Sequence, residues 1–385
     1  MNVLIINQHS SNFGDDAAGT ALVQMLLKQK EVDKINIIYN ADQKIPLEHE
    51  KVQHCLDIRF RNVGYFSVLL YLILCPYGFV GFKETMKKWA KIINDADIVF
   101  VAPSGANIGI YKDWRFLIRV LMAVRADKKV IFHYNTIGAS GNILFDAISK
   151  YVIKKSKLYV REKKSYEYIK SLGLKSTLGP DTAFALAPIC ETTDDKLISI
   201  VPSHFDDWHP NFQNNPVDDR ILNKLIPEIA RWLKVNQCRI QILPHLCLAD
   251  EREFNTKILK KFQECGINDV VFRDDVDSMW KYDYEISRSR LVIGMRYHAV
   301  VLAAKNYRPF ISLSYENKMK EVCSYLHSTD FDLDLIGFAK GKSLHLFKTL
   351  NKAYNKHNGI ARNLKKVIVK EIIPKVTIPI NDNMT

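Results

Sequence analysis

The segment 294–298, GMRYH, places an arginine and a histidine where chemistry is expected. An apolar run at 291–294 predicts a strand before it, and the small-residue run at 299–304 predicts a helix after it. Arg296 and His298 therefore lie at a strand-to-helix turn. A guanidinium, an imidazole and a helix N-terminus together suit an anion that must also receive a proton. An isolated Arg-x-His pair is more often structural, but its place at this turn favours a functional role.

A second polar segment, QHSSNFGD at 8–15, follows the first apolar run of the chain. Gly14 permits a tight turn, and Asp15 or Asp16 can cap the helix expected next. A helix N-terminus attracts anions, although an aspartate there competes with a phosphate. The segment lacks the Gly-x-Gly-x-x-Gly pattern, so we expect no dinucleotide cofactor.

Two further strand ends are candidates for ligand contact. The segment VAPSGAN at 101–107 ends an expected strand with small residues, including Gly105, that let a ligand approach the backbone. A tight turn without a ligand is the alternative. His245 follows another expected strand, at 239–243, where it either contacts a ligand or only leads the chain into the next helix.

Histidines and cysteines elsewhere show no metal-site spacing. His204 and His209 share one loop, but their separation is not diagnostic of a metal site, and we expect no metal. The seven cysteines are scattered and include no Cys-x-x-Cys pair. Such a set in a long chain is typical of reduced thiols, which predicts a cytoplasmic protein. The N-terminus lacks the basic and long apolar regions of a signal peptide and indicates a first strand instead.

Two series of alternating strands and helices must position these segments. Strands are predicted at 3–7, 35–39, 98–102, 129–133 and 158–160, and again at 197–201, 239–243, 269–272, 291–294 and 309–313. Helices of the second series are predicted at 221–235, 251–265, 279–287, 298–306 and 318–326. This alternation is typical of parallel sheets. We therefore predict an α/β protein with two Rossmann-like, doubly wound domains that face a central cleft, which is the GT-B architecture.

The same series sets the expected domain boundaries. Residues 1–190 form the N-terminal Rossmann-like domain, with an apolar insertion at 62–82. Residues 191–338 form the second Rossmann-like domain and carry the Arg-x-His turn. Residues 339–385 form a basic C-terminal helix and tail.

The chain has a net charge of +13, from 55 Lys and Arg against 42 Asp and Glu. Such an excess favours an anionic partner: a nucleic acid, an anionic membrane surface or a phosphorylated substrate. Neither a zinc finger nor an RNP-type aromatic pattern accompanies the charge, so we expect no nucleic acid partner. Hydrophobic residues make up 47%, which is ordinary for a globular protein with buried cores.

The insertion 62–82 contains no charged residue, and basic residues flank it on both sides. A helix of about 20 residues can span a bilayer. Pro76 and three glycines interrupt this segment, however, and a span would separate the first strands from the rest of their sheet. A buried helix pair and an interfacial membrane anchor are therefore both favoured over a span.

The segment 340–370 has nine Lys or Arg and no Asp or Glu. Leu344, Phe347, Leu350 and Tyr354 recur at helical spacing, which predicts an amphipathic basic helix. It either packs on the body of the protein or attracts anionic lipid. Together with the insertion 62–82, the second interpretation predicts a peripheral protein on the inner face of the membrane.

These motifs, in this order, resemble the polysaccharide pyruvyltransferase family over residues 1 to about 326. The glycine-rich stretch that the family has after its third strand is sparser here, at 103–106, and the insertion 62–82 is not expected of every member. The matching segments are NFGD at 12–15, Arg161 and Glu162 with Ser165, PDTAF at 180–184, GMRYH at 294–298 with the helix after it, Pro309, and Tyr315 with Lys318.

The resemblance implies transfer of the enolpyruvyl unit of phosphoenolpyruvate onto two hydroxyls of a sugar, which leaves a cyclic pyruvate ketal and phosphate and needs no cofactor. The donor carries a phosphate and a carboxylate, so we expect Arg296, Arg161 and Lys318 to bind it. His298 is expected to protonate the methylene carbon of the donor, because histidine titrates near neutral pH.

The base for the sugar hydroxyl is expected among Asp15, Asp181 and Asp250, in that order, with a turn role as the alternative for Asp181. Asn12, Gly105, Asp181 and His245 are the remaining candidates for substrate binding. The expected acceptor is a glycan or a lipid-linked oligosaccharide of an exopolysaccharide or capsule pathway.

The main rival interpretation is a GT-B glycosyltransferase that uses a nucleotide sugar. That class often binds the ribose of its donor with a late glutamate. Here the Arg-x-His turn occupies the corresponding region, and the nearest acid, Glu316, comes well after it.

Overall fold

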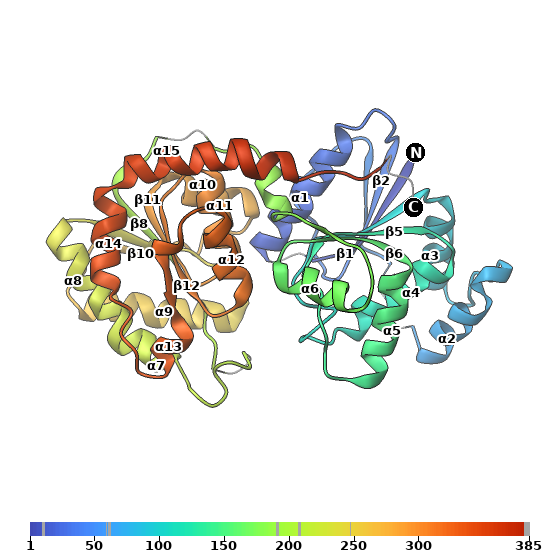
Figure 1. Cartoon of the computed structure of the whole chain (residues 1–385), viewed down its shortest axis with the longest axis horizontal. Helices are drawn as coiled ribbons and strands as arrows, with labels where there is room; N and C mark the ends of the chain where they lie inside the picture. Colours follow the sequence, from blue (N-terminus) through green and yellow to red (C-terminus); the bar gives the residue numbers. More distant parts are fainter. Residues whose placement is uncertain are drawn as a thin grey trace. The chain divides into compact units, whose positions relative to one another are not determined.

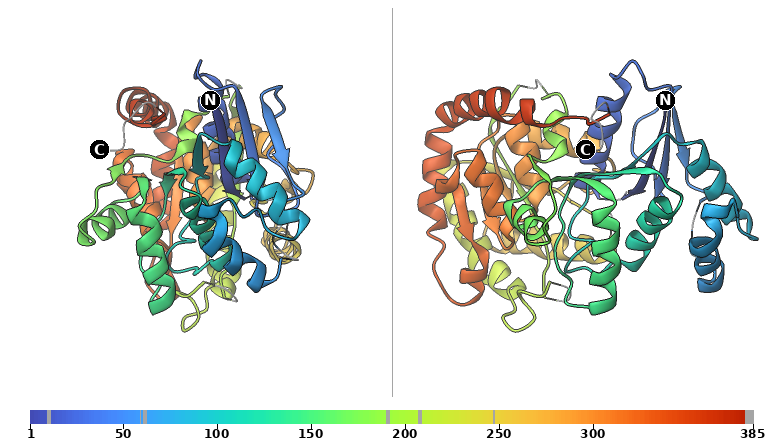
Figure 2. Two further views of the ribbon diagram at one scale, coloured as in Figure 1. Left: turned by 90° about the vertical axis from the view of Figure 1, so that its right-hand side faces the viewer. Right: turned by 45° about the vertical axis from the view of Figure 1, so that its right-hand side comes forward.

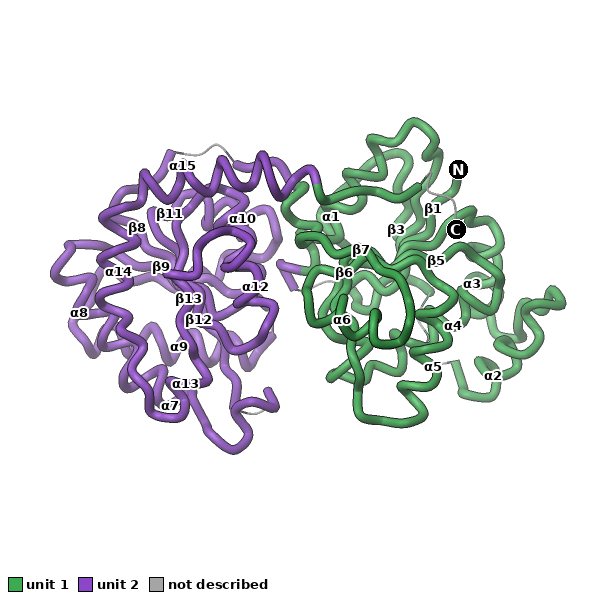
Figure 3. Tube along the Cα trace, viewed as in Figure 1, with its two compact units in different colours: residues 1–11, 15–185, 375–385 green, residues 12–14, 186–374 purple. Residues whose placement is uncertain are grey.

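The computed structural model describes residues 1–9, 12–58, 60, 63–189, 192–206, 209–246 and 248–380. The chain forms two compact units (Figure 3). Unit 1 comprises Met1–Ser11, Asp15–Ala185 and Lys375–Thr385, and unit 2 comprises Asn12–Gly14 and Leu186–Pro374. The chain therefore passes between the units near residue 185, a few residues before the expected boundary. The expected C-terminal segment 339–385 is divided, with residues up to 374 in unit 2 and the rest in unit 1.

Unit 1 is a parallel sheet with helices between its strands (Figure 1). In the described ranges its strand order is β3-β2-β1-β4-β5-β6-β7, and each of these pairs is parallel. The strands are β1 (Asn2–Gln8), β2 (Lys34–Tyr39), β3 (Val52–Cys55), β4 (Ile98–Val101), β5 (Lys129–Asn135), β6 (Ser156–Val160) and β7 (Thr177–Leu178). The helices are α1 (Phe13–Leu27), α2 (Tyr65–Leu74), η2 (Cys75–Tyr77), α3 (Glu84–Asp95), α4 (Trp114–Arg125), α5 (Ile143–Lys154), α6 (Lys163–Ser171) and η3 (Thr182–Ala185).

Unit 2 repeats the same winding, with the order β10-β9-β8-β11-β12-β13 in the described ranges and parallel pairing throughout. Its strands are β8 (Asp194–Val201), β9 (Arg239–Ile242), β10 (Val270–Phe272), β11 (Ser289–Gly294), β12 (Phe310–Ser314) and β13 (Asp332–Asp334). Its helices are α7 (Asp218–Arg220), η4 (Ile221–Leu225), α8 (Ile226–Asn236), α9 (Ala249–Glu264), α10 (Met279–Arg288), α11 (Tyr297–Lys305), α12 (Asn317–Tyr325), η5 (Thr329–Phe331), α13 (Leu335–Ala339), α14 (Leu346–Asn355), α15 (His357–Val367), η6 (Ile368–Ile372) and η7 (Ile373–Lys375).

Both units have the doubly wound topology that the sequence predicts. In each one, the strand order reverses beside the first strand of the unit, between β1 and β4 and between β8 and β11. Ligands of open α/β sheets bind at the carboxyl ends of the strands at such a switch point. In unit 2 this point carries Arg296, directly after β11, and in unit 1 it carries the loop with Gly105, directly after β4.

Two strands of unit 1 bend just before the loops that follow them. The pairing of β1 shifts register between Ile5 and Gln8, and that of β5 shifts between Phe132 and Asn135. Asn7 has φ 63° and Tyr134 has φ 54°, so each strand contains one residue in the left-handed region. Bulges of this kind often occur beside functional sites, where they redirect the residues that follow.

Helix α11 is held to α10 by charged side chains inside unit 2. All nine residues of α11 are buried, which its small side chains permit. Asp283 of α10 accepts from Lys305 Nζ at 2.5 Å and from Asn306 Nδ2 at 2.6 Å. The carboxylate is fully buried and the lysine is 1% exposed. The pair therefore anchors the C-terminal end of the helix whose other end begins at Arg296.

The basic C-terminal segment folds onto unit 2 as two helices, α14 and α15, rather than one. Apolar side chains of both helices are buried, including Leu350 and Leu364. Trp232 Nε1 of α8 donates to Asn351 Oδ1 at 2.7 Å, which ties α14 to the body of the unit. Most of the apolar side of this segment is therefore covered by protein, although Val369 is 49% exposed.

The apolar insertion is short in its helical part. Helix α2 has ten residues and ends at Leu74, and Pro76 lies in the 3-10 turn that follows. Gly78 and Gly81 have φ 83° and 88°, so the glycines break the helical run as their spacing suggests. Within the described ranges, no helix has both the length and the apolar character that crossing a bilayer requires.

Candidate active site

The loop after β1 joins the candidate site of unit 2. Asn12 forms an antiparallel bridge with Leu246, and Phe13 N–H donates to the carbonyl of His245 at 3.2 Å. Asn12 Oδ1 accepts from Gly14 N–H at 3.0 Å, which closes the turn. The three residues 12–14 thus form part of unit 2, although the chain on both sides of them belongs to unit 1 (Figure 3).

Gly14 is required by the side chain of His298. A Cβ atom at position 14 would lie 2.0 Å from His298 Nδ1 and 2.3 Å from its Cγ. Real Cβ atoms do not approach other atoms so closely, and His298 is only 5% exposed, so its ring has little room to move. The glycine of the early motif and the histidine of the late motif therefore belong to one site.

Arg296 lies at the N-terminus of α11 and is held there by Glu251. Its extended backbone, with φ −119° and ψ 138°, turns the chain from β11 into the helix. Its Nη2 donates to the carboxylate of Glu251, which lies in the first turn of α9 and is 1% exposed. This buried pair orients a planar guanidinium, whose five N–H donors match the oxygens of a carboxylate or phosphate. Glu251 is thus a positioning residue for Arg296.

The pKa of His245 is shifted by burial and by the charged groups around it. It follows β9, its ring stacks on that of His298 with centroids 6.3 Å apart, and its Nδ1 lies 3.3 Å from Tyr282 Oη. Burial lowers the pKa of His245 well below its usual range, and the positive charges of Arg296, His298 and Lys318 lower it further. The imidazole of His245 is therefore neutral in an electropositive environment.

Lys318, near the start of α12, belongs to a second polar group in unit 2. Its Nζ lies 2.5 Å from Glu316 Oε2, and His209 Nε2 lies 3.0 Å from Glu316 Oε1. Asn211 N–H donates to His209 Nδ1 at 3.3 Å, so the proton of a neutral His209 is on Nε2 and is donated to Glu316. Burial raises the pKa of Glu316, but Lys318 and His209 outweigh it, and the net direction is downward. Glu316 is therefore ionised and orients Lys318.

Arg161 and Asp181 form a buried ion pair within unit 1. Arg161 Nη1 donates to Asp181 Oδ2 at 2.6 Å, and Arg161 Nε lies 3.3 Å from Thr136 Oγ1. The other oxygen of Asp181 accepts from Ala183 N–H at 2.8 Å. The pair joins the ends of β5 and β6 to the η3 turn. Asp181 thus acts as a turn residue and as the counter-charge of Arg161.

Glu162 and Ser165, which complete the mid-chain motif, form a network that supports the loop after β5. Ser165 Oγ donates to Glu162 Oε1 at 3.1 Å and accepts from Ile137 N–H at 2.9 Å. Both side chains are buried. Their role in this structure is to hold a loop at the carboxyl edge of the sheet.

Three amide and imidazole side chains meet at the carboxyl edge of the unit 1 sheet. His9 Nε2 lies 3.2 Å from Asn107 Nδ2 and 3.4 Å from Asn40 Nδ2. These residues follow β1, β4 and β2, on both sides of the switch point. Gly105 lies in the same loop as Asn107, and a Cβ atom there would meet the Tyr111 ring at 3.3 Å. Hydrogen-bonding groups of this kind suit sugar hydroxyls, and the sequence alone did not single out His9 or Asn107.

At the start of α1, Asp16 lies next to the predicted Asp15 and is the more deeply buried of the two. Burial raises the pKa of Asp16 to about 8, and the charge of Asp15 raises it further. Its Oδ1 is buried, and no hydrogen-bond partner for this atom occurs in the described ranges. Asp16 therefore carries a proton at neutral pH. Asp15 is half-buried.

The raised pKa of Asp16 predicts that the free energy of unfolding falls as the pH rises. Its folded-state pKa lies above its ordinary value of 3.8, so the folded chain binds this proton more tightly than the unfolded chain between about pH 4 and pH 8. We expect the unfolding free energy of Asp16→Asn to exceed that of the unsubstituted chain by an amount that grows with pH, at most about 1.4 kcal/mol per pH unit. Urea unfolding at several pH values measures this difference. Parallel curves for the two proteins would contradict the assignment.

The loop histidine His204 and the candidate base Asp250 lie close to each other. His204 Nε2 lies 3.2 Å from Asp250 Oδ2, and Asp250 is largely exposed. In the part of the chain that the structure describes, no group of three or more His, Cys, Asp or Glu side chains is placed to hold a metal ion.

Unit 2 thus brings together Arg296, His298, His245, Lys318 and Asn12 from four separate segments. The predicted residues Arg161, Asp181, Asp15 and Gly105 lie in unit 1. The sequence analysis missed Glu251 as the partner of Arg296. A signal for Glu251 in the sequence is its place beside Asp250, in the first turn of an expected helix.

Solved structures share the two-unit fold at low sequence identity. The UDP-GlcNAc 2-epimerase of Neisseria meningitidis bound to UDP-GlcNAc has a TM-score of 0.59 and 11% identity, with 98% of this chain and 97% of that chain covered. The UDP-GlcNAc 2-epimerase of Methanocaldococcus jannaschii has a TM-score of 0.54 and 13% identity, with coverages of 89% and 93%. Anabaena HepE in complex with UDP and glucose has a TM-score of 0.52 and 12% identity, with coverages of 98% and 97%. Such likeness shows the GT-B fold alone.

The sequence itself identifies the family. None of the curated proteins matches the chain. The family profile described as polysaccharide pyruvyl transferase matches residues 12–317, a range that begins at Asn12 and includes Arg161, Arg296 and His298. Because this match covers most of the chain, the protein belongs to the polysaccharide pyruvyl transferase family.

Proposed function

We propose that the protein transfers a pyruvyl group from phosphoenolpyruvate to two hydroxyls of a sugar in a cell-surface polysaccharide or its lipid-linked precursor. The observation that carries this proposal is that Arg296, held by Glu251, and His298, packed against Gly14, lie two residues apart at the start of α11. Burial and the charges of Arg296, His298 and Lys318 lower the pKa of His245 nearby. Positive charge is concentrated where an anionic donor has to bind. Membership of the family supplies the reaction class.

The reaction needs one acid and one anion-binding group beside each other. Arg296 binds the carboxylate or phosphate of the donor, and Glu251 holds its guanidinium in place. His298 gives a proton to the methylene carbon, which becomes the methyl group, and positive charge develops at the neighbouring carbon. One sugar hydroxyl adds to that carbon, phosphate leaves, and the second hydroxyl closes the ketal. The two hydroxyl protons restore His298 and leave with the phosphate, so atoms and charge balance.

The other predicted residues keep supporting roles in this proposal. Lys318 adds positive charge near the donor, with its orientation set by Glu316. Asn12 closes the turn that brings Gly14 against His298. Contact of Arg161 with the donor and of Gly105 with the acceptor remain predictions, as does the role of Asp15 as base. No cofactor takes part in these steps.

Thermal unfolding in the presence of candidate donors tests the proposal. We expect phosphoenolpyruvate to raise the Tm of the protein in a concentration-dependent manner, because a ligand that binds only the folded state stabilises it. The comparison uses UDP-GlcNAc and inorganic phosphate at the same concentrations. Stabilisation by UDP-GlcNAc with none by phosphoenolpyruvate would instead support the nucleotide-sugar glycosyltransferase. Equal stabilisation by phosphate and phosphoenolpyruvate would argue against specific donor recognition.

A further inference from the structure

Helix α2 is apolar on two opposite sides. Val68, Leu72 and Cys75 pack against the core of unit 1, and Tyr71 is part of that core. This spacing of three and four residues uses one side of the helix. The helix is therefore already anchored to the protein, and its other side is not needed for the core.

The second side of α2 is apolar and faces solvent. Tyr65 is 92% exposed, Phe66 74%, Leu69 56% and Ile73 53%, and Tyr77 in η2 is 85% exposed. We call these five residues the α2 face. Large exposed apolar patches are rare on soluble proteins and mark interaction surfaces. In Figures 1 and 2, α2 lies at the periphery of unit 1.

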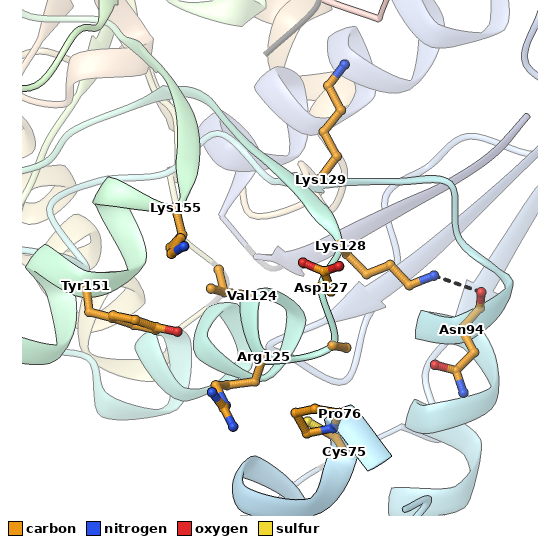
Figure 4. A pocket seen from close by; sticks show the side chains of 11 residues that line it. Cys75, Pro76, Asn94, Val124, Arg125, Asp127, Lys128, Lys129, Tyr151 and Lys155 are labelled. Carbon is orange, nitrogen blue, oxygen red and sulfur yellow. Dashed lines mark hydrogen bonds between the residues drawn. The ribbon is translucent and has the colours of Figure 1, made fainter. Parts of the chain in front are cut away.

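A basic pocket lies at the C-terminal end of the same helix. It has a volume of about 760 Å³ and is lined by Cys75 and Pro76 on one side and by Arg125 of α4 and Lys155 on the other (Figure 4). Lys128 and Lys129 also line it, against one carboxylate, Asp127. Its charged lining is therefore predominantly positive.

Three hydrogen bonds fix the walls of the pocket, and one of them ties α4 to the end of α2. Arg125 Nε donates to the carbonyl of Leu72 at 2.9 Å, which binds the end of α2 to α4. Lys128 Nζ donates to the carbonyl of Asn94 at 2.9 Å (Figure 4) and to the carbonyl of Ala96 at 2.9 Å, so this side of the pocket is held in place. A second pocket shares Lys155 and adds Lys154, Lys157, Lys170 and Lys175.

We propose that the α2 face inserts into the interfacial region of an anionic lipid bilayer and that the adjacent basic pocket receives a lipid phosphate. A ten-residue helix is too short to span a bilayer but suits an orientation in its plane. Aromatic residues such as Tyr65, Phe66 and Tyr77 favour the boundary between headgroups and acyl chains. Nearby lysines and arginines are attracted to the negative surface potential of anionic lipids.

Charge complementarity favours a bilayer over a second copy of this chain. The protein has a net charge of +13, and the lining of the pocket beside the α2 face is predominantly positive, so two copies meeting at this face would repel each other. A bilayer that contains anionic lipid satisfies both features, because it offers an apolar layer under a layer of phosphates. Membrane binding of this kind does not depend on which donor the active site uses.

Sedimentation of the full chain with lipid vesicles tests this proposal. We expect binding to vesicles of phosphatidylcholine mixed with phosphatidylglycerol, weaker binding to phosphatidylcholine alone, and weakening by salt. The double variant Phe66→Ser with Leu69→Ser should bind roughly tenfold more weakly or worse, because each side chain contributes more than a factor of ten when fully buried. Both residues are exposed, so the variant should fold, as circular dichroism checks.

Matched substitutions elsewhere serve as controls. Val235→Ser with Val369→Ser removes two exposed apolar side chains of unit 2 and should leave binding unchanged. Lys155→Glu should weaken binding to the anionic vesicles, whereas Lys260→Glu, an equal change of charge on α9, should weaken it much less.

Three results would overturn the proposal. The first is that the protein binds neither kind of vesicle. The second is that the Phe66 and Leu69 double variant binds as well as the unsubstituted protein. The third is that light scattering shows a dimer, that the double variant is a monomer, and that no vesicle binding is seen. The last would assign the α2 face to contact between copies. Because the donor test depends on Tm shifts with phosphoenolpyruvate, each proposal can fail while the other stands.

Discussion

Replacing His298 with alanine is expected to lower the rate of pyruvyl transfer about 100-fold or more while binding of phosphoenolpyruvate persists, because a general acid contributes to the transition state rather than to the bound donor. Replacing Arg296 with alanine should lower the rate by a similar factor and weaken donor binding as well. The measurements are phosphate release in the presence of the acceptor glycan and the donor-dependent Tm shift. The different effects on binding and rate distinguish a proton donor from an anion-binding group.

Folding must be separated from chemistry in this experiment. Arg296→Ala leaves the carboxylate of Glu251 buried without its counter-charge, which is destabilising in its own right. Arg296→Lys keeps the charge but not the planar fork, so it should fold and still lose most of the activity. Glu251→Gln should retain donor binding with reduced affinity, because the guanidinium then loses its orienting partner. If His298→Ala or Arg296→Lys kept more than about a tenth of the original rate, the corresponding role would be wrong.

Replacing Asp283 with alanine is expected to destabilise the protein by roughly 3–5 kcal/mol. The substitution leaves the ammonium group of Lys305 buried at 1% exposure without its carboxylate and removes the acceptor of Asn306. The free energy of unfolding from urea titrations followed by circular dichroism measures the effect. The variant should lose activity only under conditions in which part of the protein is unfolded.

Two variants make this prediction specific. Asp283→Leu combined with Lys305→Met replaces the charged pair by apolar groups and should be more stable than Asp283→Ala, because neither charge then stays buried alone. Glu253→Ala removes one partner of the exposed pair with Lys257 and should have little measurable effect. A loss of less than about 1 kcal/mol in Asp283→Ala would show that water reaches Lys305, contrary to its burial.

Most of the fold was predictable because buried parallel strands are apolar on both faces. The strands around β1, β4, β8 and β11 appear in the sequence as apolar runs bounded by loops, and they are observed where the runs predict them. The strands β3, β7 and β13 were missed. They have four, two and three residues and lie at or next to the edges of their sheets, where polar side chains are tolerated and the apolar signal disappears.

Amphipathic character alone left two interpretations open at the C-terminus. The spacing of Leu350 and Tyr354 predicts an apolar side, but the sequence does not say whether protein or lipid covers it. In the structure the apolar sides of α14 and α15 pack on unit 2. The insertion 62–82 differs, because one side of α2 packs on the core and the other remains exposed.

The sequence by itself determined which residues of the late motif belong to a strand-to-helix turn, since the apolar run, the Arg-x-His segment and the small-residue helix are contiguous. Only the tertiary structure decided what surrounds them. Gly14 lies against His298, which is hundreds of residues away in the sequence. Glu251 pairs with Arg296, which is tens of residues away. Burial likewise raised the pKa of Asp16. Local patterns specify elements, whereas proximity and burial arise from packing, which no local pattern contains.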